Sequence, residues 1–251
     1  MKPILYISLT AWLLLLIAVW AFPIGFTACA KGSFWCQAVY WLTESAGKYG
    51  TLLITVGAAY LYTIRLTSKT EKTKVFFRSL LSLLVFLSVF AYINEHGTKK
   101  IMKFLRPSHL YVAEHAAEKI RPDSLFALSK EERRSYLQYT IDKNQTSFND
   151  IDAKVLAHWV EESGFSFPSG HSFNAFLLAC VLAFSIYSNE KHRKLFFFPF
   201  AWALFVCISR VAIGAHSALD VSVGAALGMS IALLFLYFDT TRKLIIHKRK
   251  Q

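Results

Sequence analysis

The hydrophobic residues of this chain fall into long continuous blocks, without the alternating or helix-periodic stripes of a water-soluble protein. An α-helix needs about 18 or more mostly apolar residues to cross roughly 30 Å of hydrocarbon. Six blocks approach or meet this length: residues 4–24, 49–66, 75–93, 172–187, 195–213 and 221–238. Continuous blocks favour helices over a membrane barrel, whose strands would alternate. The pattern therefore predicts an all-α polytopic membrane protein with six transmembrane helices.

The connections between the blocks are short, except for the one between the third and fourth. This segment, residues 95–170, carries eleven Lys/Arg and eleven acidic residues. Within it, Ser129 followed by Glu132 has the form of a capping box, which predicts a short helix through Tyr139. We therefore expect one integral membrane domain, residues 1–251, with a partly helical external cap at about 95–170.

The charge distribution gives the expected orientation. Hydrophobic residues make up 55% of the chain, and the net charge is +12. A charge of this size raises the question of a nucleic-acid partner, but most of it lies in four segments: Lys2 and residues 65–78, 191–194 and 242–250. These carry fourteen Lys/Arg against three nearby acidic residues, and they alternate with the other connections along the six spans. The positive-inside rule places them in the cytoplasm with both termini, so we expect a membrane partner and no nucleic acid.

Two features near the N-terminus allow alternatives. Lys2, an apolar core and the small residues at 27–30 also fit a cleaved signal peptide, although the apolar stretch is long for one. Cys29 and Cys36 fall in the first external loop, where an oxidising compartment would permit a disulfide. Spacing alone leaves that pairing open.

Two clusters of polar residues adjoin the long external segment. Lys99 and Arg106, the latter followed by Pro107, come just after the third span. If that helix continues to Arg106, both cations lie on one face and suit an anionic ligand, although a basic run beside a membrane can also simply reach for water. Ser169-Gly170-His171 comes immediately before the fourth span, and a Ser-Gly helix start leaves free N–H groups that can bind an anion.

A third cluster joins the last two spans. Arg210 follows Ser209, and His216 precedes Asp220 by four residues, so a helix entering the sixth span would place the last two on one face. The carboxylate could then orient the imidazole and leave its other nitrogen free to attack. A His–Asp pair that only caps a helix is the simpler alternative.

The expected topology places all three clusters on the external face. Together they supply two histidines, one aspartate and three cations. These are groups suited to transferring a phosphoryl group to histidine and then to water.

In type and spacing, the three clusters resemble the signature of the type 2 phosphatidic acid phosphatase superfamily. The matching residues are Lys99-x6-Arg106-Pro107, Pro168-Ser169-Gly170-His171 and Ser209-Arg210-x5-His216-x3-Asp220. The six spans and the long external segment resemble the bacterial phosphatidylglycerophosphatase B group most. Glu161-Glu162-Ser163-Gly164-Phe165 also resembles that group and marks Glu162 as a possible accessory residue.

The resemblance implies a role for each matching residue. His216 would be the nucleophile that forms a phosphohistidine, Asp220 would orient it, and His171 would be the general acid. The phosphate-binding groups would be Lys99, Arg106, Ser169, Gly170 and Arg210. Members of the superfamily need no metal, so no cofactor is expected.

The expected function is hydrolysis of a lipid phosphomonoester or pyrophosphate at the periplasmic face of a bacterial inner membrane. Candidate substrates are phosphatidylglycerophosphate, phosphatidic acid, diacylglycerol pyrophosphate and undecaprenyl pyrophosphate. One alternative is a lipid phosphotransferase, in which another hydroxyl replaces water. A second is a non-catalytic lipid transporter on the same fold, against which the intact His171, His216 and Asp220 argue. Oligomeric state has no signal in the sequence.

Overall fold

The computed structural model of the chain describes residues 2–22, 24, 29–64, 66–116 and 121–238. The basic segment 242–250 and Arg65, both expected on the cytoplasmic side, lie outside the described residues. The described part is almost entirely helical, and an isolated bridge between Ala30 and Ile151 is its only β pairing. The prediction of an all-α protein is confirmed.

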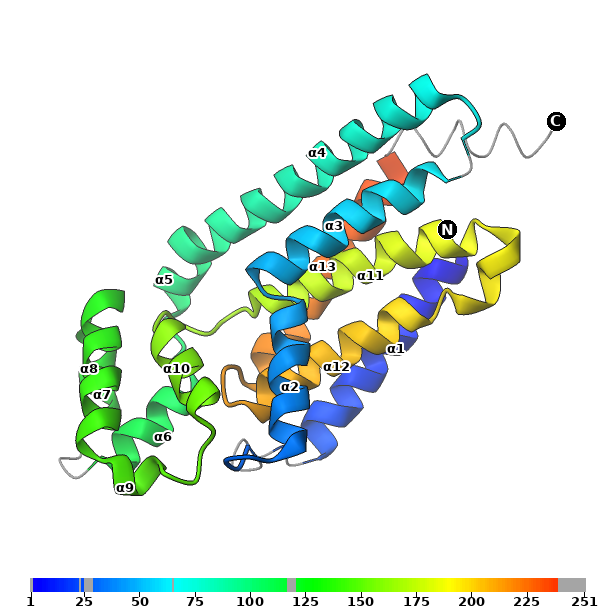
Figure 1. Ribbon diagram of the computed structural model, residues 1–251. Coiled ribbons are helices and arrows are strands. Elements are labelled where there is room, and N and C mark those ends of the chain that lie inside the picture. The colour runs from blue at the N-terminus through cyan, green and yellow to red at the C-terminus, as the bar shows by residue number, and fades with distance from the viewer. Residues whose placement is uncertain (1, 23, 25–28, 65, 117–120, 239–251) are drawn as a thin grey trace.

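The long helices form a bundle, shown in Figure 1. They are α1 (Lys2–Ala21), α3 (Lys48–Thr63), α4 (Lys69–Ile93), α11 (Gly170–Tyr187), α12 (Phe198–Ala212) and α13 (Ala218–Phe238). A short helix, α2 (Phe34–Ser45), leads into α3, and a 3-10 helix, η3 (Glu190–Leu195), leads into α12.

Five helical segments are long and apolar enough to cross a membrane within the described residues. They are Lys2–Ala21, Lys69–Met102, Gly170–Tyr187, Glu190–Ala212 and Ala218–Phe238. The chain is therefore a multi-pass membrane protein. Helix α3, the expected second span, has 16 residues, or about 24 Å of helix, which is short of the roughly 30 Å hydrocarbon core. The count of six spans thus stays a prediction.

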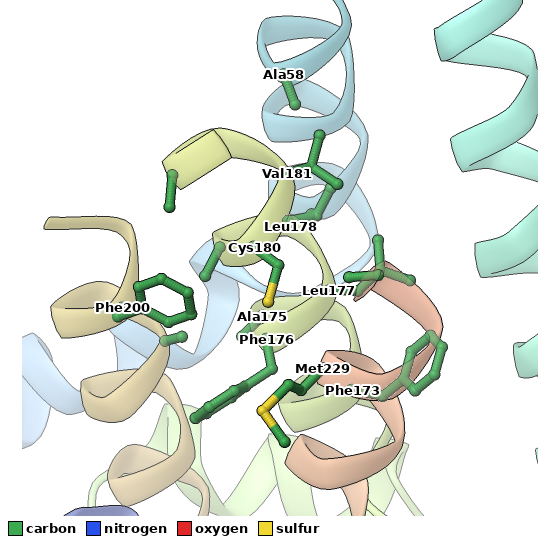
Figure 2. Packing of buried hydrophobic residues seen from close by; sticks show 14 of the residues in the cluster. Ala58, Phe173, Ala175, Phe176, Leu177, Leu178, Cys180, Val181, Phe200 and Met229 are labelled. Atoms are coloured by element: carbon green, nitrogen blue, oxygen red, sulfur yellow. The ribbon is translucent and has the colours of Figure 1, made fainter. Parts of the chain in front are cut away.

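Helix α11 lies at the centre of the bundle. Phe173, Phe176 and Cys180 on this helix are fully buried, and Figure 2 shows them beside Phe200 of α12 and Met229 of α13. Because α11 is surrounded by other helices, its N-terminus is held in a fixed position, and that N-terminus carries one of the three polar clusters.

Two glycines allow α13 to approach α11 closely. A Cβ atom added at Gly224 would overlap the carbonyl oxygen of Ser169, and one added at Gly228 would overlap that of Phe173. Only the absence of a side chain permits this backbone contact.

The long segment between α5 and α11 forms a helical cap at one end of the bundle. Its helices are α6 (Pro107–His115), α7 (Pro122–Ala127), α8 (Lys130–Lys143), α9 (Gln145–Phe148) and α10 (Ala153–Glu161). The predicted capping box is present: Ser129 Oγ accepts from Glu132 N at 3.2 Å, and Ser129 N donates to the Glu132 carboxylate at 2.7 Å. A prediction of a partly helical cap is therefore confirmed.

The cap has a hydrophobic core of its own. Leu137, Phe148 and Trp159 pack there with Ile213 and Ala215, which belong to the connection between α12 and α13. Trp159 Nε1 also donates to the carbonyl oxygen of Ile213 at 2.6 Å. The cap therefore fixes the backbone of the segment that carries His216.

The two ends of the bundle differ in charge. Figure 1 shows the cap at one end, and the α3–α4 and α11–α12 connections at the other. Both of these connections belong to the basic segments identified in the sequence. The arrangement of the helices agrees with the alternation of charge along the chain.

Cys29 and Cys36 are both buried free thiols in the core of the cap. Burial, followed by the hydrogen bond to Cys36, raises the pKa of Cys29. The two cysteines are therefore neighbours in the folded chain.

Candidate active site

His216 lies in a tight turn between α12 and α13. Gly214 makes this turn possible because its φ of +71° falls in the left-handed region, which glycine adopts at no steric cost. Helix α13 begins at Ala218, so His216 precedes the helix instead of sharing it with Asp220 as predicted. The two side chains still meet, with His216 Nδ1 3.6 Å from Asp220 Oδ2.

Asp220 holds the start of α13 as well as facing the histidine. Its Oδ2 atom accepts from Ser217 N at 2.7 Å, and its own N donates to Ser217 Oγ at 3.2 Å. The Asp220 carboxylate therefore caps helix α13 and also faces the His216 imidazole. The sequence alone had left these two roles as alternatives. The cap fixes the carboxylate opposite the imidazole.

The second ring nitrogen of His216 faces a cation. Nε2 lies 3.3 Å from Arg106 Nη1. Burial, followed by the charge of Arg106, lowers the pKa of His216 to about 3. The imidazole is therefore neutral at physiological pH. A proton on Nδ1, toward Asp220, leaves the lone pair of Nε2 free on the side of the arginine.

The Ser169-Gly170-His171 cluster begins helix α11 as predicted. Ser169 is its N-cap and accepts from Ser172 N at 3.3 Å. Ser169 N also donates to the carbonyl oxygen of Asp220 at 3.0 Å, which ties this cluster to the histidine turn. The imidazole of His171 lies on the same side, with Nδ1 3.8 Å from Glu162 Oε1.

The helix of the third span does not continue to Arg106, so the condition for placing Lys99 and Arg106 on one helix face is not met. Helix α4 continues through a π-helical turn, η2 (Asn94–Thr98), and a last turn, α5 (Lys99–Met102), and then stops at Lys103 with φ +49°. Pro107 begins the next helix instead of ending this one, because its fixed φ suits a first helical turn. The break lets Arg106 turn inward, where it is 4% exposed.

Arg106 crosses the site and holds three segments together. Its Nε donates to the carbonyl oxygen of Gly164 at 3.1 Å, and its Nη1 donates to that of Ala215 at 2.8 Å. Nη1 also pairs with Glu162 Oε2 at 2.7 Å. A guanidinium is rigid and has several donors, so it can make these contacts at once.

Glu162 joins the two arginines of the site. Its Oε2 accepts from Arg106 and from Nη2 of Arg210, a residue that is fully buried. Burial alone would raise the pKa of this carboxyl group, but Arg210 and then Arg106 outweigh it and hold the pKa well below its usual range. The ionised carboxylate therefore lies between two guanidinium groups, a coordination that a phosphate oxygen could also take.

His158 is a site residue that the sequence reasoning missed. Its Nε2 lies 2.8 Å from Arg210 Nη1, and its Nδ1 is 3.6 Å from Glu44 Oε1. Burial, followed by the charge of Arg210, lowers its pKa to about 4, so the neutral ring can accept from the guanidinium. The spacing of four residues between His158 and Glu162 on a helix was the signal that could have identified it.

Lys99 lies at the edge of this cluster. Its ammonium group pairs with Glu95 at 2.8 Å, one helical turn earlier. The structure therefore brings His216, His171, Asp220, Arg106 and Arg210 together with Glu162, and it turns Lys99 toward the cap. Within the described residues, no group of three or more His, Cys, Asp or Glu side chains is placed to hold a metal ion.

Comparison with known proteins bears on this arrangement. The sequence model described as the PAP2 superfamily matches residues 79–244, a range that contains all three polar clusters. The chain belongs to the PAP2 superfamily. The family resemblance inferred from the motifs is confirmed.

Two relatives are named phosphatidylglycerophosphatase B. The one from Bacillus subtilis is 37% identical over 34% of this chain and 50% of its own length. The one from Haemophilus influenzae is 31% identical over 61% of this chain and 62% of its own length. The chain thus spans about half to three fifths of the length of these relatives.

Gly224→Ala is expected to destabilise the protein and to lower its activity. The added methyl group would collide with the Ser169 carbonyl, and overpacking of this kind costs about 1–3 kcal/mol. The displaced Ser169 would disturb its bond to Asp220. Thermal unfolding and turnover of the purified variant measure both effects. Gly57→Ala is the matched control, because a Cβ atom at that helical position meets nothing within 4 Å.

Proposed function

We propose that this chain is a lipid phosphatase that hydrolyses a phosphomonoester or pyrophosphate headgroup through a phosphohistidine at His216. One observation carries the proposal: Nδ1 of His216 faces Asp220 at 3.6 Å, while Nε2 faces Arg106 at 3.3 Å. A neutral imidazole is thereby oriented with its nucleophilic nitrogen toward a cation that can hold a phosphate.

In the first step, Nε2 of His216 attacks phosphorus, and the bond from phosphorus to the leaving oxygen breaks. Arg106 and Arg210 stabilise the charge on the phosphoryl oxygens. His171 gives its proton to the leaving oxygen, which departs as an alcohol or as a shorter phosphate. Asp220 stabilises the positive charge that develops on the imidazole, through its contact with Nδ1.

In the second step, water attacks the phosphohistidine. His171, now neutral, takes a proton from the water, the bond from phosphorus to Nε2 breaks, and inorganic phosphate leaves. Each residue returns to its starting state. A lipid phosphotransferase would replace this water with another hydroxyl.

Glu162 is proposed to exchange places with the substrate. Its carboxylate holds Arg106 and Arg210 at a common point, and a phosphate bearing two negative charges would compete for the same donors. Displaced from the arginines, Glu162 remains near His171 and can favour its protonated form. Ser169 Oγ, Gly170 N and Lys99 would complete the phosphate site.

The charge pattern supports one orientation in the membrane. We propose that the basic connections face the bacterial cytoplasm with both termini, and that the cap and the site face the periplasm. The lipid tail would remain among the spans while its headgroup reaches His216.

Phosphate release from a panel of purified lipid phosphates in detergent tests this function. We expect turnover of at least one among phosphatidylglycerophosphate, phosphatidic acid, diacylglycerol pyrophosphate and undecaprenyl pyrophosphate. Release from none of them would contradict the proposal. Adding competing alcohols distinguishes a phosphotransferase, because that enzyme would form a new phosphoester.

Chelation of divalent metals is expected to leave the rate unchanged. In this mechanism the guanidinium groups stabilise the equatorial oxygens, which is the part magnesium plays in kinases. Activity is measured before and after treatment with EDTA, with a magnesium-dependent phosphatase as the positive control for chelation. Loss of activity with EDTA and recovery with magnesium would contradict this mechanism.

A further inference from the structure

A basic cavity lies beside the proposed active site. It has a volume of about 710 Å³ and is bounded by α5, by the start of α8 and by the segment before α11. Five basic residues line it, against three glutamates. The basic ones are Lys99, Lys100, Lys103, Lys130 and Arg133, and the acidic ones are Glu95, Glu131 and Glu132.

Arg133 is the unusual member of this group. It is 3% exposed, and its Nε and Nη1 atoms have no hydrogen-bond partner among the described residues. The face of its guanidinium lies 3.9 Å from the centroid of the Phe165 ring. Stacking on an aromatic ring leaves the N–H edge of an arginine available for an anion. A buried cation without an acidic partner is costly unless it binds one.

The three glutamates of the cavity do not supply that partner. Glu132 is held by the capping box, in which it accepts from Ser129 N at 2.7 Å. Glu95 pairs with Lys99 at 2.8 Å and with Lys130 at 3.1 Å. Glu131 is exposed. Arg133 therefore has donors that the described protein groups leave unused.

The cavity adjoins the catalytic arginine through Gly164. This residue lines the cavity, and its carbonyl oxygen accepts from Arg106 Nε at 3.1 Å. Burial, followed by the charge of Arg106, lowers the pKa of Arg133, because two like charges disfavour each other at short range. An anion bound at Arg133 would reduce this repulsion. The cavity that contains Arg133 and the donors of Arg106 thus meet at the Gly164 backbone.

We infer that this cavity is a subsite for a second phosphate group of the same lipid headgroup, the one that is not hydrolysed at His216. Arg133 would donate to its oxygens, with Lys130 adding charge at the rim. The subsite fits lipids with two phosphates, such as phosphatidylglycerophosphate, whose phosphodiester lies beyond the terminal phosphomonoester. Phosphatidic acid, which has one phosphate, would not fill it. This inference rests on the proposed function.

The test compares Arg133→Gln with the wild type on phosphatidylglycerophosphate and on phosphatidic acid. The measured quantity is the ratio of the two kcat/KM values. Loss of a charge-assisted bond is expected to lower this ratio roughly 10–100-fold. Arg134→Gln is the matched control, because the neighbouring arginine on α8 is exposed and its loss removes the same charge without changing the ratio.

A fall in both activities with the ratio unchanged would overturn the inference, because it would assign Arg133 to folding alone. If Arg133→Gln cannot be purified in folded form, Lys130→Gln replaces it. The side chain of Lys130 is 51% exposed, so its loss should be tolerated while the ratio still falls, and an unchanged ratio would also overturn the inference.

Inhibition by inorganic phosphate distinguishes a cavity that binds released phosphate from one that binds the lipid headgroup. If Arg133→Gln weakens inhibition by inorganic phosphate but leaves the substrate ratio unchanged, the cavity binds released phosphate and the headgroup inference fails. If the wild type hydrolyses neither lipid, the proposed function itself fails, and the two failures are therefore distinguishable.

Discussion

Replacing His216 with alanine is expected to abolish phosphate release, with a loss of at least about 10⁴-fold in turnover. The reason is that the proposed mechanism passes the phosphoryl group through Nε2 of His216, the imidazole nitrogen that faces Arg106. Arg106 lies 3.3 Å from Nε2, and its charged guanidinium cannot replace the imidazole as a nucleophile. Labelled phosphate should become covalently attached to the wild type after a rapid quench in base, where phosphohistidine survives, and not to His216→Ala.

Folding of this variant has to be shown separately, because His216 is buried. Size-exclusion chromatography and thermal unfolding in detergent serve this purpose. His192→Ala is the matched control, since His192 lies exposed on η3, at the other end of the bundle. Normal turnover by folded His216→Ala would remove the nucleophile from the proposal.

Changing Arg106 to lysine should lower kcat/KM by about 10²–10³-fold, although the positive charge is kept. Loss of one donor that stabilises a transition-state oxygen has an effect of this size. Arg106 also bridges the carbonyl oxygens of Gly164 and Ala215 while it faces His216. A lysine ammonium is a single point of charge and cannot span these positions.

Steady-state kinetics on one lipid phosphate measure this change, with Arg134→Lys as the control for the same substitution on the surface of the cap. We expect kcat to fall and KM to rise, since Arg106 contacts both the nucleophile and the proposed phosphate position. An unchanged kcat with a higher KM would limit Arg106 to ground-state binding.

The sequence anticipated the membrane architecture well, because hydrophobic blocks report directly on the length of apolar helix. It also anticipated the local signals that depend on neighbouring residues, such as the capping box at Ser129 and the N-cap at Ser169. The sequence did not indicate where the helix of the third span ends. No glycine or proline marks the break after Met102, and the expected helix through Lys99 and Arg106 stops there because Lys103 takes a left-handed conformation.

The sequence pattern also could not predict which residues contact Arg106 and Arg210. Glu162 was noticed only through the family resemblance, and His158 was missed, because both lie on the cap and meet Arg210 across about fifty positions of sequence. Arg133 is a similar case. Its sequence context is that of an exposed, charged helix, and only the packing of α8 against the Phe165 segment buries it.

The chemistry-bearing residue types, their spacing and the end of the bundle where they gather were determined by the sequence by itself. These depend on helix periodicity, on apolar length and on charge alternation, which are all local or one-dimensional properties. Tertiary structure alone decided which nitrogen of His216 faces Asp220, which carboxylate joins the two arginines, and which arginine has donors that the described residues leave unused. Those relations are contacts between distant segments, and they exist only once the cap has folded onto the α12–α13 turn.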